Sequence, residues 1–161
     1  MTQVDIVISS LCVWRENRGG KTPGMQSILN VLQNRARKRG TSVYLECVRA
    51  LQFSSMTAKG DPELTLWPAD DDPQWQTALG LAAQASAGAL PDLTGGATLY
   101  YAPKSIQSTA VITLPTGETV PFPQGWNWAA VIYTATIAEQ VFFRELVVHS
   151  AMASPSRVVV G

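Results

Sequence analysis

The sequence is poor in the side chains that build metal and nucleophile sites. Its 161 residues include two cysteines, Cys12 and Cys47, and a single histidine, His149. No Cys-x-x-Cys or comparable ligand spacing occurs, so we expect no metal site and no cofactor. A Ser-His-Asp or Cys-His hydrolase would have to use His149, which has no motif around it. The cysteines lie in helical patterns, and we expect both to be free and buried.

Net charge and long apolar runs are also missing. Twelve basic residues balance twelve acidic ones, which argues against a nucleic-acid-binding protein that works by neutralising phosphates. No run is long enough to span a membrane. Residues 1–5 contain no basic residue ahead of an apolar segment, so we expect no secretory signal. We therefore expect the protein to be made in the cytoplasm.

What the chain does contain is enough apolar material for one globular domain. Hydrophobic residues make up 46% of the sequence and charged residues 15%, which is typical of a folded chain with a real core. In the first segment, apolar residues recur at helical spacing, and this predicts a helix with one buried face formed by Val4, Val7, Ile8 and Leu11. Thr2 and Asp5 can cap its start, and Gly19-Gly20 ends it.

Further helices are predicted from caps, prolines and periodicity. One begins at Thr22-Pro23 and ends before Gly40, and another runs from Asp72-Pro73 to Gly88. A shorter one covers residues 43–51, with Leu45, Val48 and Leu51 inward. Residues 52–68 fit neither period and are expected to form a long loop of the kind that often carries function.

The second half of the chain is predicted to form β-strands. Residues 97–101, 129–137 and 140–143 are rich in β-branched and aromatic side chains, and residues 111–122 form a hairpin pattern around Pro115-Thr116-Gly117-Glu118. Helices followed by strands predict an α+β fold with a small antiparallel sheet. We expect one domain over residues 1–149 and a loose tail over residues 150–161.

Glu16 places a carboxylate at the end of an otherwise apolar helix. It falls one turn after Cys12 and Val13 and so shares their side of the helix. Burial disfavours its charged form, and the negative end of the helix dipole acts in the same direction. Both effects keep the proton on near neutral pH, as a general acid requires. On spacing alone the alternative stays open that Glu16 is a solvated residue without a chemical role.

Four segments occur in an order that matches a known family. Residues 14–20 read W-R-E-N-R-G-G and residues 24–35 read G-M-Q-S-I-L-N-V-L-Q-N-R. Gln52-Phe53-Ser54 and Leu99-Tyr100-Tyr101-Ala102-Pro103 follow. From about Leu11 to Phe143 the chain resembles the SleB-type cell wall hydrolases, the spore cortex-lytic enzyme family. Their pattern has its catalytic glutamate where Glu16 stands here.

The resemblance implies a lysozyme-like α+β fold and an enzyme that acts on peptidoglycan glycan strands. Members are generally described as lytic transglycosylases, which cleave the β-1,4 bond between N-acetylmuramic acid and N-acetylglucosamine. Two departures stand out. Trp14 and Arg15 replace the usual Gly or Ala before the motif, and Gln140 stands where the family often has a histidine.

Supporting residues for a glycan site are expected on the later segments. We predict that Gln52 and Ser54 hydrogen-bond to N-acetyl or hydroxyl groups of the substrate. Phe53 fits either the cleft floor or the core. Tyr100 and Tyr101 alternate on a strand, so only one of them can face the cleft.

The chemistry is limited by a shortage of carboxylates. Glycosidases normally use two, and no pattern directs Glu46, Asp61 or Glu63 toward Glu16. A one-glutamate mechanism fits, in which Glu16 protonates the glycosidic oxygen and then deprotonates the 6-hydroxyl of the sugar. Attack by water would make the protein a muramidase.

Other classes of protein remain open alongside the enzyme. A non-catalytic peptidoglycan-binding or structural protein is one, and a small-molecule hydrolase is a weaker one. The missing leader fits a phage or prophage lysin, and the pattern indicates no oligomeric state.

Overall fold

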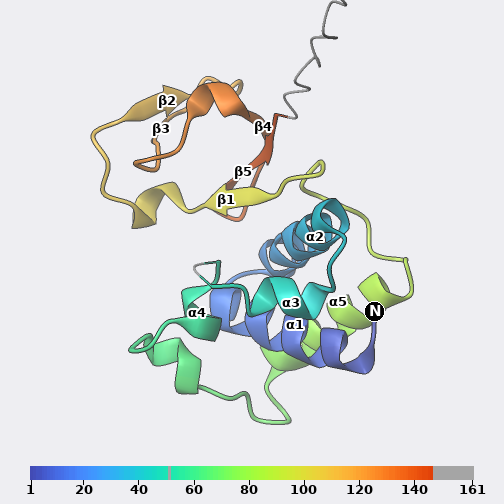
Figure 1. Ribbon diagram of the computed structural model, residues 1–161. Coiled ribbons are helices and arrows are strands. Elements are labelled where there is room, and N and C mark those ends of the chain that lie inside the picture. Colours follow the sequence, from blue (N-terminus) through green and yellow to red (C-terminus); the bar gives the residue numbers. More distant parts are fainter. Residues whose placement is uncertain (51, 147–161) are drawn as a thin grey trace, which may run out of the picture.

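The computed structural model describes residues 1–50 and 52–146, and it has a helical lobe below a lobe of short strands (Figure 1). The helices are α1 (Gln3–Asn17), α2 (Thr22–Arg39), α3 (Val43–Cys47), α4 (Ser54–Thr57) and α5 (Pro73–Ser86), with short 3-10 helices at Pro62–Thr65 (η1), Pro103–Ser105 (η2) and Trp128–Ala130 (η3). The strands are β1 (Leu99–Tyr101), β2 (Val111–Thr113), β3 (Thr119–Pro121), β4 (Val131–Ile137) and β5 (Gln140–Glu145).

The predicted helix boundaries follow from local chemistry. Thr2 and Asp5 form a capping box, in which the Asp5 backbone N–H donates to Thr2 Oγ1 over 3.1 Å and the Thr2 N–H donates to the Asp5 carboxylate over 2.8 Å. Gly40 ends α2 in the left-handed conformation, at φ 65°, where a side chain would be strained. Asp72 caps α5, as expected from Asp72-Pro73.

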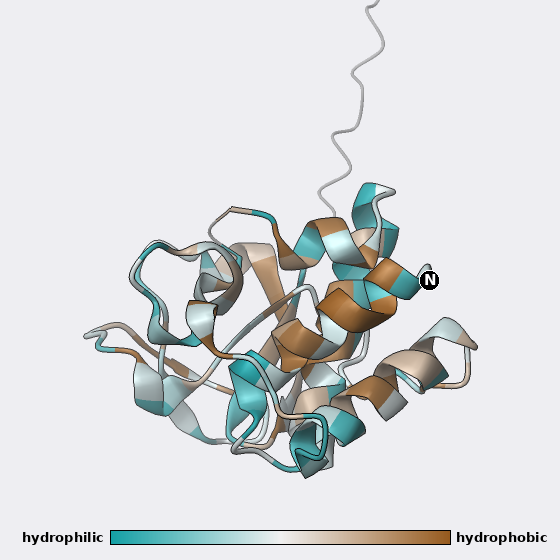
Figure 2. Cartoon of the chain, turned by 90° about the horizontal axis from the view of Figure 1, so that it is seen from below, coloured by the Kyte–Doolittle hydropathy of each residue, from teal (hydrophilic) through white to brown (hydrophobic). Residues whose placement is uncertain are grey.

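The predicted buried face of α1 is wrong at its N-terminal half. Val4 and Val7 are 56% and 47% exposed, and Figure 2 shows apolar residues along the helix that begins at the N-terminus. The inward side carries small polar residues instead. Ser10 donates to the Ala78 carbonyl of α5, and Asp5 accepts from the Tyr44 N–H of α3 over 2.8 Å. Small hydrogen-bonded side chains let the helices approach closely, and apolar periodicity cannot detect them.

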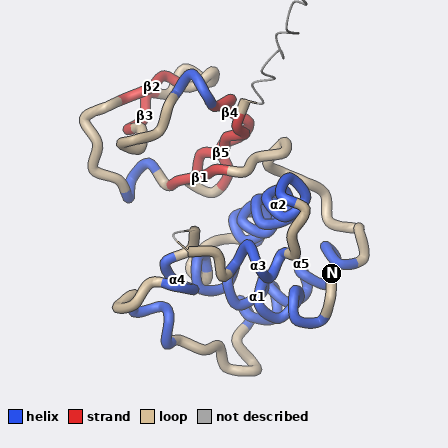
Figure 3. The backbone as a smooth tube through the Cα atoms, viewed as in Figure 1, coloured by secondary structure: helices blue, strands red, loops and turns tan. Residues whose placement is uncertain are grey.

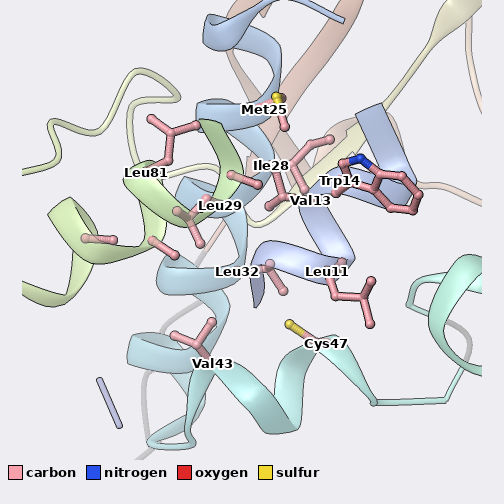
Figure 4. Close-up of a cluster of buried hydrophobic side chains, with 14 of the residues drawn as sticks. Leu11, Val13, Trp14, Met25, Ile28, Leu29, Leu32, Val43, Cys47 and Leu81 are labelled. Carbon is pink, nitrogen blue, oxygen red and sulfur yellow. The ribbon is translucent and has the colours of Figure 1, made fainter. Parts of the chain in front are cut away.

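The C-terminal half of α1 lies in the main core, as predicted. Leu11, Cys12 and Val13 pack against α2, α3 and α5 (Figure 4). Trp14 is 5% exposed, and its indole N–H donates over 2.9 Å to the Asp72 carboxylate that caps α5. Cys12 and Cys47 are both free and buried, as expected.

The third helix and the following loop differ from expectation. α3 ends at Cys47, and Leu45 is 47% exposed rather than inward. The inward position belongs to Glu46, whose side chain is fully buried with Arg39, Arg49 and Thr41 around it. Residues 52–68 are not wholly irregular, because α4 and η1 lie within them.

The strands form two small antiparallel sheets, one of three strands in the order β1-β5-β4 and a β2-β3 hairpin (Figure 3). Tyr101 pairs with Val141, and Tyr100 with Phe142. The alternation along β1 sends these two tyrosines to different clusters. Tyr101 packs with Phe122, Trp126 and Phe143 in the core of the strand lobe, whereas Tyr100 packs against the helical core.

A third cluster joins the two lobes. Val31 of α2 is buried with Ala97 and Phe142, and Tyr100 stacks on Phe142 with ring centroids 5.7 Å apart. This contact fixes β1 against the helices, so that Tyr100 comes close to the end of α1.

Some predictions fall outside the described residues: the inward position of Leu51, the role of His149, the loose tail at 150–161 and the domain end at 149. Within residues 1–50 and 52–146, no helix combines the length and apolar character that crossing a membrane requires.

Candidate active site

Glu16 lies in the last turn of α1, half-buried at the junction of the two lobes. Burial raises the pKa of its carboxyl above the ordinary value, and the nearby negative charges of Asp61 and Glu63 act in the same direction. Hydrogen bonds from Ser55 and Tyr100 oppose the shift without cancelling it. The raised pKa predicted from the position of Glu16 is therefore present, with burial as its main cause.

Two hydroxyls hold the Glu16 carboxyl from opposite lobes. Ser55 Oγ donates to Oε1 over 2.5 Å, and Tyr100 Oη donates to Oε2 over 3.3 Å. Ser55 belongs to α4 and Tyr100 to β1, so the acid is fixed where helices and sheet meet. Burial also raises the pKa of the Tyr100 hydroxyl well above its usual range, so it remains a donor.

No sequence pattern assigned a role to Ser55, the neighbour of the predicted substrate contact Ser54. The structure buries Ser55 against Glu16, whereas Ser54 is exposed and lines a hollow of about 320 Å³ with Ala50, Thr57 and Ala58. Two adjacent serines in a segment without periodicity cannot be told apart from sequence. The directions in which the two side chains point are set by α4, which begins at Ser54.

Arg15 holds the segment that carries Ser55. Its buried guanidinium donates to the Leu66 carbonyl over 2.8 and 3.1 Å and to the Ser55 carbonyl over 3.1 Å. Its terminal carbon also lies 5.3 Å from the centre of the Trp67 ring. A single side chain of α1 therefore ties both ends of residues 55–67 to the helix that bears Glu16. Because Arg15 departs from the family pattern, the resemblance gave no signal for this role.

The three other carboxylates considered as catalytic candidates are engaged in structural contacts. Glu63 forms a two-pronged ion pair with Arg18. Asp61 caps η1 by accepting from the Glu63 N–H over 2.9 Å. Burial by itself raises the pKa of Glu46, but bonds from Arg49, Thr41 and Arg39 outweigh it and bring the pKa to about 2. Glu46 is thus the centre of an ion cluster.

The remaining predicted site residues occupy different surroundings. Phe53 is 1% exposed and packs in the core, one of the two placements that its sequence allowed. Gln52 is half-buried. Tyr101 donates to the Pro121 carbonyl over 2.9 Å within the strand lobe. Of the two tyrosines, the structure brings Tyr100 to Glu16 and leaves Tyr101 in the core.

A buried arginine lies next to the Phe53 ring. Arg35 donates from Nε to the Thr98 carbonyl over 2.6 Å, and its guanidinium carbon lies 5.4 Å from the centre of the Phe53 ring. Burial lowers its pKa. Arg35 ends the family-like motif of residues 24–35, but nothing in the sequence indicated that it is buried whereas Arg37, Lys38 and Arg39 are exposed.

A second hollow lies at the connection between α1 and α2, which follows Glu16 in the chain. Its volume is about 440 Å³, and it is lined by Asn17, Gly19, Gly20, Lys21, Ala138 and Glu139. Asn17 and the glycines follow Glu16 in the chain, while Ala138 and Glu139 form the β4–β5 turn. The site is thus bounded by both lobes. Nowhere in residues 1–50 and 52–146 do three metal-ligating side chains gather.

Solved structures of two bacterial proteins share this arrangement of helices and strands. The catalytic domain of the germination-specific lytic transglycosylase SleB from Bacillus anthracis matches with a TM-score of 0.61, covering 88% of this chain and 95% of that one at 22% identity. This chain has the SleB catalytic-domain fold. The catalytic domain of SleB from Bacillus cereus gives a TM-score of 0.59, covering 88% and 91% at 21% identity.

The predicted α+β fold is confirmed by the SleB match, which spans both lobes of the chain. No family model matches this sequence, and no curated protein does so either. The backbone comparison agrees with the resemblance to the SleB-type family that the sequence motifs gave, and at 21–22% identity it shows the fold.

Proposed function

We propose that the protein cleaves the glycan strands of peptidoglycan, with Glu16 as the catalytic acid. The observation that carries this proposal is the half-buried Glu16 carboxyl, whose pKa is raised, held by Ser55 and Tyr100 between the two lobes. A raised pKa lets a carboxyl keep its proton to higher pH, which suits an acid that protonates a glycosidic oxygen. The SleB fold supports the substrate class, since the B. anthracis relative is itself a lytic transglycosylase.

The proposed reaction is that of a lytic transglycosylase. Glu16 transfers its proton to the glycosidic oxygen, and the bond from that oxygen to the anomeric carbon of N-acetylmuramic acid breaks. The acetamido oxygen of the sugar stabilises the positive charge at that carbon. The Glu16 carboxylate then takes the proton of the 6-hydroxyl, whose oxygen closes a 1,6-anhydro ring. Ser55 and Tyr100 stabilise the carboxylate between these steps by donating to it.

The contacts of the other candidate carboxylates favour a mechanism with one glutamate. Glu46 is held by arginines and Glu63 by Arg18, so both carboxylates are committed to ion pairs. Asp61 remains the nearby acid that could activate water, which would give a muramidase. Gln52 and Ser54 stay our proposed contacts to the glycan, and action on the wall as a phage or prophage lysin stays a proposal about context.

Digestion of purified peptidoglycan tests the proposal. We expect wild type to release fragments with 1,6-anhydro-muramyl ends, seen by mass spectrometry, and Glu16→Gln to release none. Glu118→Gln, which changes an exposed glutamate in the β2–β3 turn, is the matched control and should retain activity. Reducing ends would indicate hydrolysis instead. Binding of the wall without release of fragments would favour the non-catalytic alternative, and full activity of Glu16→Gln would refute the role of Glu16.

A further inference from the structure

A third hollow, of about 290 Å³, lies at the junction of the lobes where the C-terminal end of α2 meets β5. Arg37 and Lys38 of α2 and Arg144 of β5 are among the residues that line it. Cations in the last turn of a helix are expected from the helix dipole. That reason does not extend to Arg144, which lies on a strand and still adds its charge to the hollow.

An ion pair uses one of these cations and leaves the two arginines. Lys38 is paired with Glu145 of β5, which also lines the hollow. Arg37 and Arg144 are exposed, and neither takes part in an ion pair within the part of the chain that the structure describes. The rest of the sequence contains no aspartate or glutamate. The charges of the two arginines are therefore left for a group from outside the chain.

The guanidinium of Arg37 is held in place by a buried amide. Its Nη1 donates over 2.8 Å to Oδ1 of Asn34, a residue that is 5% exposed. The Asn34 Nδ2 in turn donates to the Asp92 carboxylate over 3.0 Å and to the Ala97 carbonyl over 3.1 Å, so the amide is fixed. A guanidinium has five N–H donors in one plane. Because Arg37 is positioned in advance, it loses less freedom when it binds an acceptor.

The charge of the chain indicates a single local anion rather than a polyanion. Acidic and basic residues are equal in number, so the long-range attraction to a polymer such as nucleic acid is weak. The Glu145 carboxylate beside the hollow disfavours a multiply charged group. A guanidinium binds a carboxylate through two parallel N–H···O bonds. One carboxylate between Arg37 and Arg144 matches these conditions.

The hollow is too far from Glu16 to take part in the chemistry. Gly24 lies against the side chain of Asn17, the residue after Glu16. Arg37 lies thirteen residues further along α2 than Gly24, which is about 20 Å along the helix axis. A group bound in the hollow therefore affects how the substrate is held and not how its glycosidic bond is cleaved.

We infer that this hollow binds a carboxylate of a peptide stem of peptidoglycan, with Arg37 and Arg144 as the donors. The inference rests on the proposed function, since the peptide stems attached to the glycan strands carry free carboxylates. The stem can belong to the bound strand or to a neighbouring one, because peptidoglycan is a cross-linked network. The hollow thus holds the substrate at a second point, remote from the acid.

The test compares soluble glycan strands with and without peptide stems, bound to the inactive Glu16→Gln protein. In calorimetry we expect the strands with stems to bind about tenfold more tightly. Adding Arg37→Gln and Arg144→Gln together should abolish that preference, while stripped strands bind as they do to the parent. Lys59→Gln, which removes an exposed cation after α4, is the matched control and should keep the preference.

Two further readouts isolate the carboxylate. Strands whose stem carboxylates are converted to amides should bind the parent only as tightly as stripped strands do. In the active enzyme, the two arginine changes should raise KM for strands with stems about tenfold and leave kcat unchanged. Misfolding, by contrast, would also weaken the binding of stripped strands.

Three results would overturn the inference. One is equal binding of both kinds of strand by the parent, and another is a preference that survives amidation or the two arginine changes. The third is tighter binding of a short DNA oligonucleotide than of strands with stems, lost in the arginine variant, because the hollow would then be a phosphate site.

The failure of this inference is separable from that of the proposed function. If wild type cleaves stripped strands and Glu16→Gln does not, yet the arginine variant keeps its preference for stems, only the role of the hollow is refuted. If wild type neither binds nor cleaves either kind of strand, both proposals are refuted together.

Discussion

At the scale of single residues, burial of the Glu16 carboxyl lowers the stability of the folded protein once the pH is high enough to ionise that group. Its folded-state pKa lies above the value in the unfolded chain, so the folded state loses stability as the pH rises through that folded pKa. Glu16→Gln cannot ionise and keeps an Oε1 acceptor for Ser55. We expect its melting temperature at pH 7 to exceed that of wild type by about 2–4 °C, while near pH 4 the two proteins should converge.

Thermal unfolding followed by circular dichroism at both pH values measures this difference. Glu118→Gln is the matched control and should melt as wild type does at pH 7. A Glu16→Gln protein that melts no higher than wild type at pH 7 would contradict the assignment of a raised pKa to Glu16.

Asp61 is expected to set the alkaline limit of activity. A general acid works only while protonated, so the rate should fall as the pH rises through the Glu16 pKa. The negative charge of Asp61 helps to raise that pKa. Asp61→Asn removes the charge but keeps the oxygen that caps η1, so the alkaline limb of the kcat/KM profile should move to lower pH by a few tenths of a unit.

The profile is measured on peptidoglycan across the neutral range. Asp70→Asn, a charge change at an exposed position, should leave the limb in place. A limb that moves to higher pH in Asp61→Asn would show that the sign is wrong, and complete loss of activity would indicate that Asp61 is a second catalytic carboxylate.

At the scale of elements, residues 55–67 depend on Arg15. The guanidinium bonds two carbonyls at once, and a lysine ammonium cannot reproduce that planar geometry. We expect Arg15→Lys to lower the free energy of unfolding by about 1–3 kcal/mol. The backbone amides of Ala58 and Leu66, which bond to Ser54 and Glu63 carbonyls, should exchange faster with solvent.

Hydrogen exchange resolved by residue checks this prediction. Arg37→Lys replaces an exposed arginine whose bond goes to Asn34, and it should leave the exchange of Ala58 and Leu66 unchanged. Equal protection of both amides in Arg15→Lys and wild type would mean that the segment holds its place without this side chain.

At the scale of the whole molecule, the fold was easier to predict than the site. Caps and turns are local, so Thr2-Asp5, Gly40 and Asp72-Pro73 could be assigned from short stretches of sequence. The inward face of α1 could not, because Ser10 is buried by a hydrogen bond to a distant helix. Glu16 combined a local pattern with a family likeness. The position of Ser55 depends on Arg15, which holds residues 55–67 against α1. No local sequence pattern predicts that contact.

The two buried thiols give the helical lobe an internal reporter. Cys12 and Cys47 are both fully buried in the core that α1 and α3 share, and burial raises the pKa of the Cys12 thiol well above its usual range. A thiolate-directed alkylating reagent can therefore reach them only when α1 or α3 separates from the shared core. We expect labelling in the native protein to be slow, single-phased and accelerated by low concentrations of urea, as mass spectrometry would record. Rapid labelling without denaturant would contradict the tight seating of these helices. Because Cys12 lies one turn before Glu16, the labelling rate of Cys12 measures how often the helix that carries the proposed acid opens.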